Sequence, residues 1–214
     1  MARTAGSDGE KTEAAIREAA ARLIARHGFD AVTMRQLAAE VGVQAAALYR
    51  YFPAKEDLLF RLMQDHMRDL IAALGENLPG MASPTERLDA FIANHVRFHV
   101  ERRHATHVSN MELRSLAPEH LSDILRLRGT YERELRHILR EGAEDGSFAI
   151  EDVAFASMAI IQMVTGVIVW FRPDERLTIA DVTRTYQTMT RRLAGAAENR
   201  EALHVPERDE IRIW

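Results

Sequence analysis

Apolar residues recur at intervals of three and four positions in nearly every segment of this 214-residue chain. No segment alternates apolar and polar residues with the period of two that a half-buried strand requires. Glycine and proline separate the segments at spacings that suit helices of ordinary length. The pattern therefore predicts an all-α fold. Apolar residues make up 47% of the chain, which is enough for a packed core and too many for a disordered protein.

The composition excludes several classes of protein. The chain has no cysteine, which excludes a disulfide framework, a thiolate zinc site and a cysteine nucleophile. The first residues, MARTAGSDGEKTEAA, contain no apolar core of a secretory signal, so we expect a cytoplasmic protein. The most apolar segment, residues 154–171, is borderline in length for a membrane span. Its polar residues and the lack of a second span favour a helix buried on nearly all sides, and we expect no membrane partner.

Helix length changes along the chain. The helices expected before about residue 55 are short and end at tight turns, whereas the later ones are longer and have broad apolar faces. We therefore expect a small N-terminal three-helix domain over residues 1–55 and a larger helical domain over residues 56–195. A charged tail over residues 196–214 follows.

The most informative segment is TMRQLAAEVGVQAAALYRYFPAKEDL, residues 33–58. Thr33 and Gln36 have the spacing of a capping box at the start of a short helix, and Gly42 ends that helix. A second short helix is expected at about residues 44–51. Two short helices joined by a glycine-containing turn are typical of a helix-turn-helix, whose second helix fits the major groove of DNA.

These residues resemble the signature of TetR-type regulators, in which a threonine-capped helix precedes the patterns A-x-x-x-G-V, L-Y-x-[HY]-F and K-x-x-L. The matching residues are Thr33, Ala38, Gly42, Val43, Leu48, Tyr49, Tyr51, Phe52, Lys55 and Leu58. The resemblance implies a homodimer with an N-terminal helix-turn-helix domain and a larger helical domain for ligand binding and dimerisation. It also implies a repressor that binds double-stranded operator DNA and is released by a small hydrophobic effector. It implies no enzymatic activity and no cofactor, and it leaves open an activator.

The residues expected to contact DNA follow from this resemblance and from their chemistry. Thr33 begins a helix whose free N–H groups suit a phosphate, and Lys55 holds a phosphate in relatives. Gln44 and Arg50 are best placed to read base edges. Alanines stand where the family often has polar residues, so DNA shape is expected to carry much of the specificity. The predicted DNA-binding set is Thr33, Arg35, Gln44, Ala45, Ala47, Tyr49, Arg50, Tyr51 and Lys55.

The larger domain carries methionine and aromatic residues that suit an adaptable apolar pocket, although such residues also pack ordinary cores. Its segment WFRPDERLT, residues 170–178, resembles a W-[FY]-R-P segment in the branch of the family that senses acyl-CoA thioesters or related acids. The turns before it lack the arginines of CoA-binding relatives, so a fatty acid or acyl-CoA and a plain hydrophobic molecule both remain candidates. The predicted ligand-binding set is Phe91, His95, Phe98, His99, Met111, Met158, Gln162, Met163 and Trp170.

Histidines gather in one part of this domain. His95 and His99 are one helical turn apart, and His104 and His107 follow closely. This is the spacing of metal ligands, but the glutamate that follows the first histidine in a zinc peptidase is absent. A polar end of the ligand pocket, or a place on the surface, explains the histidines at least as well, and we expect no metal. Two alternatives to a regulator remain: a DNA-binding protein of the same fold with a non-transcriptional role, and a metal-dependent hydrolase that uses His95, His99 and Glu101.

The last two long helices, residues 152–171 and 178–194, are expected to pair with their symmetry mates in a four-helix bundle. Ala156, Ala159 and Gly166 are small enough to allow the helices to approach closely. A twofold dimer presents two recognition helices to successive major grooves, so we expect the operator to be nearly palindromic.

Overall fold

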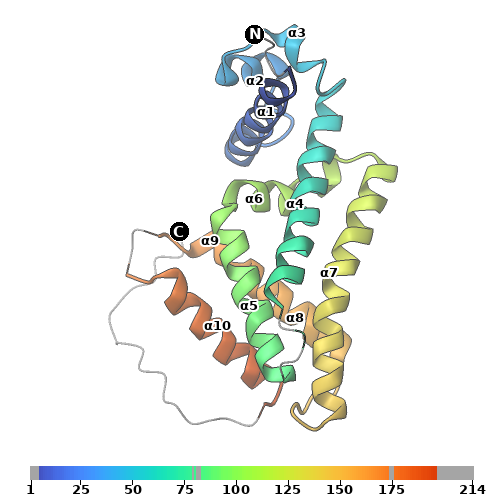
Figure 1. The fold of residues 1–214 in the computed structure, drawn as a ribbon, viewed down its shortest axis with the longest axis vertical. Coiled ribbons are helices and arrows are strands. Elements are labelled where there is room, and N and C mark those ends of the chain that lie inside the picture. Colours follow the sequence, from blue (N-terminus) through green and yellow to red (C-terminus); the bar gives the residue numbers. More distant parts are fainter. Residues whose placement is uncertain (1–4, 79, 81–82, 174–175, 197–214) are drawn as a thin grey trace. The chain divides into compact units, whose positions relative to one another are not determined.

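The computed structural model describes residues 5–78, 80, 83–173 and 176–196 (Figure 1). Its elements are α1 (Ala5–His27), α2 (Met34–Val41), α3 (Ala45–Leu48), α4 (Lys55–Asn77), α5 (Pro84–Glu101), α6 (Arg103–Met111), the 3-10 helix η1 (Leu113–Ser115), α7 (Pro118–Glu144), α8 (Val153–Thr165), α9 (Val167–Trp170) and α10 (Ile179–Leu193). No strand occurs in the described part of the chain, and the all-α prediction is confirmed. Of the expected charged tail, all but Ala196 lies outside the described residues.

The chain forms two compact units. The head unit comprises residues 1–68 and 102–127, and the body unit comprises residues 69–101 and 128–214. Helices α4 and α7 therefore each contribute to both units, and α6 with η1 belongs to the head. The functional division expected at residue 55 stays a prediction.

The turns of the head are set by local sequence. The Thr33 hydroxyl oxygen accepts the N–H of Gln36 at 3.2 Å, and the Gln36 side-chain oxygen accepts the N–H of Thr33 at 2.8 Å, so the capping box is confirmed. Gly42 ends α2 at φ 74°, a left-handed conformation that glycine adopts without strain. Gly28 follows α1 in the same conformation, at φ 82°. These two glycines turn the chain between the three N-terminal helices.

The three N-terminal helices share one apolar core with the start of α4. Helix α3 is shorter than predicted, because the N–H groups of Arg50 and Tyr51 bond to carbonyls only three residues back, those of Ala47 and Leu48, as in a 3-10 turn. Helices as short as α2 and α3 are not stable alone, and burial of each large apolar side chain contributes about 2 kcal/mol. The core side chains that are almost completely buried include Ile16, Ile24, Leu37, Leu48, Leu58 and Leu59.

In the body, α5 packs along α10 and also contacts α8 and α9 (Figure 1). The predicted start of α5 is confirmed, since the Ser83 hydroxyl accepts the N–H of Glu86 at 3.3 Å and the Glu86 carboxylate accepts the N–H of Ser83 at 2.9 Å. Thr178 and Asp181 form the same reciprocal cap on α10. The body core includes Leu88, Phe91, Ile92, Leu135, Ile138, Ile160 and Val164.

The long helix expected to end at Phe171 is interrupted at Gly166, which separates α8 from α9. A glycine within a helix costs about 1 kcal/mol relative to alanine. Its neighbours Thr165 and Val167 are β-branched and have a lower helix propensity than straight side chains. The helix is therefore interrupted where its local helix propensity is low, although a single glycine does not by itself require a break.

The apolar segment Val153–Trp170 is long and apolar enough to cross a membrane by length and composition alone, and 33% of it is buried. The expectation that this segment is buried on nearly all sides is therefore wrong. Phe155, Met158 and Val169 are 64%, 51% and 63% exposed, and on α10 Met189 is 44% exposed. These exposed large apolar side chains make α8, α9 and α10 the candidates for an interaction face.

Candidate functional site

The residues predicted to contact DNA lie at the start of α2, where Thr33 is the N-cap, on α3 and in the turn after it, and at the first position of α4, which is Lys55. Thr33, Arg35, Gln44 and Arg50 are exposed, and Tyr49 is 51% exposed. Gln44 is the N-cap residue of α3, but its side chain makes no capping hydrogen bond. The amide of Gln44 is therefore not needed by the helix and can bind another group.

The orientation of α3 differs in one respect from the expected set. Ala45 and Ala47 are half-buried, whereas Ala46 is exposed. Leu48 is fully buried, and a residue two positions earlier in an α-helix points to roughly the opposite side. The helical rotation counted back from the apolar Leu48 could therefore have identified Ala46 as the outward-facing alanine from the sequence alone. The methyl group of Ala46 can make only apolar contacts, so it adds no hydrogen-bonding group to the outward face of α3.

Lys55 has a structural role that the sequence did not reveal. Its ammonium donates to the backbone oxygens of Phe29 at 2.9 Å and Val32 at 3.1 Å. The Nζ atom also lies 4.1 Å from the centroid of the Phe29 ring, a favourable cation–π position. An ammonium has three N–H donors, so one remains for a phosphate. Lys55 thus holds the α1–α2 loop, and its contact with DNA stays a prediction.

Glu112, which the sequence reasoning also missed, binds the same loop. Its Oε1 atom accepts the N–H of Phe29 at 3.1 Å, although the two residues are 83 positions apart. The Ser115 hydroxyl donates to the other carboxylate oxygen, Oε2, at 3.0 Å. No local signal in the sequence predicts a pair so distant along the chain.

A polar cluster lies inside the body. His95 and His99 stack with 3.8 Å between ring centroids. The His95 Nδ1 atom lies 3.1 Å from the Tyr131 hydroxyl, and its Nε2 atom lies 3.0 Å from the Thr165 hydroxyl. His99 Nδ1 lies 2.8 Å from the His95 carbonyl, and since a carbonyl only accepts, this nitrogen carries a proton. Hydrogen bonds with groups on α5, α7 and α8 therefore fix the orientation of the two histidine rings.

Burial controls the protonation of this cluster. Burial lowers the pKa of His99 to about 4, the nearby charge of Arg128 acts in the same direction, and the hydrogen bond to His95 opposes both. Burial also raises the pKa of the Tyr131 phenol and lowers the pKa of Arg128. His99 is therefore neutral at pH 7 and supplies a hydrogen-bonding ring rather than a charge.

The structure brings together only part of the predicted ligand-binding set. Phe91, His95, Phe98 and His99 are all buried on α5. Tyr131 and Thr165 join them, and both were missed. Trp170 is half-buried and donates from Nε1 to the Tyr186 hydroxyl at 3.3 Å, and Met163 is also half-buried. Three members lie elsewhere: Met158 and Gln162 are exposed on α8, and Met111 is exposed in the head.

The histidines do not form a metal site within the described residues, where no group of three or more His, Cys, Asp or Glu side chains is placed to hold an ion. His104 and His107 are exposed on α6 in the head, whereas His95 and His99 are buried in the body. Both ring nitrogens of His95 already lie within hydrogen-bonding distance of hydroxyl groups.

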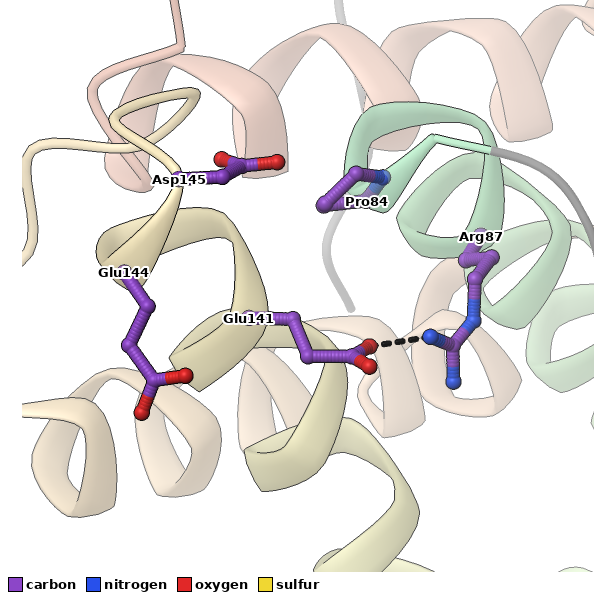
Figure 2. A pocket seen from close by; sticks show the side chains of 5 residues that line it. All are labelled: Pro84, Arg87, Glu141, Glu144 and Asp145. Atoms are coloured by element: carbon purple, nitrogen blue, oxygen red, sulfur yellow. Dashed lines mark hydrogen bonds and ion pairs between the residues drawn. The ribbon is translucent and has the colours of Figure 1, made fainter.

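An open hollow of about 420 Å³ lies in the body, between the end of α7 and the start of α5. Figure 2 shows the side chains that line it. The Arg87 guanidinium points at Glu141 and forms an ion pair with it, while Glu144 and Asp145 point elsewhere. Three carboxylates and one guanidinium give the hollow a net negative charge, which suits neither an apolar molecule nor an acid. The hollow does not match the predicted effector.

Two family models match the chain. Residues 16–62 match the model described as bacterial regulatory proteins of the tetR family, and residues 81–194 match the tetracyclin repressor-like C-terminal domain. The chain belongs to the TetR family. The resemblance seen in the sequence is confirmed, and the TetR-family protein is a helix-turn-helix transcriptional regulator. Neither matching model describes an enzyme.

Individual relatives agree with this assignment. The HTH-type transcriptional repressor KstR2 of Rhodococcus jostii is 26% identical over 185 residues, which are 86% of this chain and 90% of KstR2. The solved structure of the TetR family transcriptional regulator PfmR from Thermus thermophilus is 35% identical with a TM-score of 0.77, covering 83% of this chain and 97% of PfmR. AibR, solved with isovaleryl coenzyme A and operator DNA, is 26% identical with a TM-score of 0.77, covering 87% of this chain and 100% of AibR.

Proposed function

We propose that this TetR-family protein is a dimeric repressor in the cytoplasm that binds a near-palindromic operator and is released by a small hydrophobic effector. The observation that carries the proposal is the outward face of a well-capped helix-turn-helix, where Gln44, Ala46, Tyr49 and Arg50 are exposed together. The face has no role in the core of the head. An α-helix presented in this way fits the major groove.

Operator binding needs two kinds of contact: contacts with phosphates, which position the protein on the duplex, and contacts with base edges, which distinguish one sequence from another. Thr33 caps α2, and we propose that the free N–H groups of the first turn of α2 bind one phosphate and that the phenol of Tyr49 binds another. Gln44 and Arg50 supply the polar groups that can distinguish bases. The net charge of −4 does not oppose this, because only the docking face must attract DNA.

The partner proposed for the exposed apolar face of α8, α9 and α10 is a second copy of the same chain. Phe155, Met158, Val169 and Met189 form this face. Dimerisation is typical of the family. A twofold axis through a face of this kind would pair α8 and α10 with their symmetry mates and give the dimer two heads for two half-sites.

The effector is proposed to bind in the body beside α5. The buried rings of Phe91 and Phe98 offer an apolar wall, and His95, Tyr131 and Thr165 offer polar atoms for one functional group. A molecule with an apolar chain and one polar group fits this chemistry. Because AibR was solved with isovaleryl coenzyme A, fatty acids and acyl-CoA thioesters are the first effectors to test. Near-complete release requires the effector to favour the released state by about 5.5 kcal/mol, or about 10⁴-fold.

The proposal is tested by fluorescence anisotropy with a labelled duplex from the DNA directly upstream of the protein's own gene. Binding is measured at two salt concentrations, with and without a panel of fatty acids and acyl-CoA thioesters. We expect tight binding of one dimer per duplex and release by a member of the panel. Binding without release by any member would contradict the effector class, and no binding at low salt would contradict the repressor itself.

Replacement of Lys55 by methionine is expected to weaken binding to all duplexes alike. If the third N–H of each Lys55 contacts a phosphate, the variant dimer loses about two such contacts, and the slope of log Kd against log salt falls by about 1.8. Arg68→Met is the matched control, because it removes one exposed positive charge further along α4. An unchanged slope together with a lower unfolding temperature would show that Lys55 only holds the α1–α2 loop.

A further inference from the structure

Two side chains, those of Lys55 and Glu112, hold the loop between α1 and α2, and both bind the backbone of Phe29. The carbonyl of Phe29 accepts from Lys55 Nζ at 2.9 Å, while the N–H of Phe29 donates to Glu112 Oε1 at 3.1 Å. Phe29 itself is 5% exposed. This loop is the chain's direct connection between α1 and the helix-turn-helix, so its conformation sets the orientation of α2 against α1.

The two anchors come from different parts of the sequence. Lys55 belongs to the start of α4, next to the helix-turn-helix. Glu112 lies between α6 and η1, in the segment of residues 102–127 that belongs to the head, although the chain on either side of it belongs to the body.

The chemistry of Glu112 suits an anchor. An ionised carboxylate that accepts a backbone N–H makes a stronger hydrogen bond than a neutral acceptor does. The Ser115 hydroxyl, 3.0 Å from Oε2, fixes the orientation of the carboxylate. Helix α6 also packs against α1, so the two ends of the hydrogen bond are carried by elements in contact.

We propose that Glu112 is a positioning residue for operator binding. Its carboxylate holds Phe29, and with it the α1–α2 loop, in the conformation in which α2 and α3 fit DNA. The proposal rests on the proposed function and names a residue, outside the helix-turn-helix, on which its DNA-binding conformation depends.

The test compares Glu112→Ala with Glu112→Gln in the full-length protein, with the same upstream duplex. Alanine removes the acceptor, and if about one molecule in ten then keeps the competent loop, the Kd for the duplex rises about tenfold. Glutamine keeps an oxygen acceptor for Phe29, so its Kd is expected to stay within about threefold of the wild type. The exchange rate of the Phe29 amide proton, measured by NMR, is expected to rise at least about tenfold in the alanine variant alone.

Two controls separate positioning from general stability. Glu119→Ala removes an exposed carboxylate at the start of α7 in the same unit and is expected to leave the Kd unchanged. Leu135→Ala creates a cavity in the body and lowers the unfolding temperature without altering the loop, so at a temperature where it is folded its Kd is also expected to stay unchanged. An equal rise in Kd for Leu135→Ala would overturn the proposal.

Three further results would contradict the positioning role of Glu112. If the wild type binds the duplex and Glu112→Ala binds equally well, Glu112 does not position the head, even when the Phe29 amide exchanges faster. If the Phe29 amide exchanges at the wild-type rate, Glu112 does not hold the loop. A wild type that fails to bind the duplex overturns the proposed function first and this inference with it. Ser115→Ala, which removes only the orienting hydroxyl, is expected to raise the Kd about two- to threefold by loosening the carboxylate.

Discussion

Replacing Phe155 by glutamate is expected to convert the protein from a dimer to a monomer at micromolar concentration. The Phe155 side chain is 64% exposed in the single chain and lies on the apolar face proposed to meet a second copy. A carboxylate buried there without a partner costs about 2 kcal/mol or more per copy. A dimer contains two copies, so the cost is about 4 kcal/mol and the dissociation constant rises about 10³-fold.

Analytical ultracentrifugation measures this change directly. Leu125→Glu is the matched control, because Leu125 is also a large apolar side chain, 51% exposed, but lies on α7 in the head unit and outside the proposed face. The control is expected to sediment like the wild type. A Phe155→Glu protein that remains a dimer would show that another surface joins the two copies.

The same substitution is expected to weaken operator binding although it alters no residue of the head. A dimer that holds one head on a half-site places the second head at a high effective concentration at the other half-site, and a monomer loses this advantage. The Kd for the duplex is therefore expected to rise at least about 10²-fold. Retention of wild-type affinity by a proven monomer would contradict recognition by two heads.

Much of the fold could be predicted because its boundaries are set by local chemistry. The cap formed by Thr33 and Gln36 and the left-handed turn at Gly42 depend on residues only a few positions apart, and both were predicted. The break at Gly166 was not predicted. A single glycine is tolerated in many helices, and whether it interrupts one depends on the tertiary environment.

The contacts that link distant segments could not be predicted. Lys55 was expected at DNA because its spacing fits the family signature, but the spacing says nothing of the Phe29 and Val32 carbonyls that it also binds. The hydrogen bond from Phe29 to Glu112 joins residues 83 positions apart, and Tyr131 reaches His95 from another helix. Such pairs depend on how helices pack, which periodicity does not specify.

The burial of α8 shows a second limit of prediction from the sequence. Its composition is apolar on all sides, so a single sequence cannot distinguish a helix in the core of one chain from a helix at an interface between two chains. Met158 and Gln162 were assigned to a ligand pocket in the larger domain, whereas the structure places both on the exposed side of α8. Both residues remain testable through their effect on dimer formation.

His99 should make the folded protein sensitive to mild acid. Its side chain is 4% exposed, and burial lowers its pKa from an ordinary 6.5 to about 4. The ring of His95 stacks on it, and the charge of Arg128 further disfavours the protonated ring. The unfolded chain therefore binds a proton at this residue below about pH 6.5, while the folded chain does not until about pH 4.

The contribution of His99 to stability is fully present above pH 6.5 and declines as the pH falls from 6.5 towards 4. Between pH 7 and pH 5 the loss amounts to about 2 kcal/mol. Glutamine cannot titrate. Between pH 7 and pH 5 the free energy of unfolding of His99→Gln, measured in urea, is therefore expected to fall by about 2 kcal/mol less than that of the wild type. His104→Gln, which removes an exposed histidine from α6, is expected to keep the wild-type dependence on pH. If the two variants and the wild type lose equal stability between pH 7 and pH 5, His99 is not held neutral by burial, and the polar cluster in the body must be open to water.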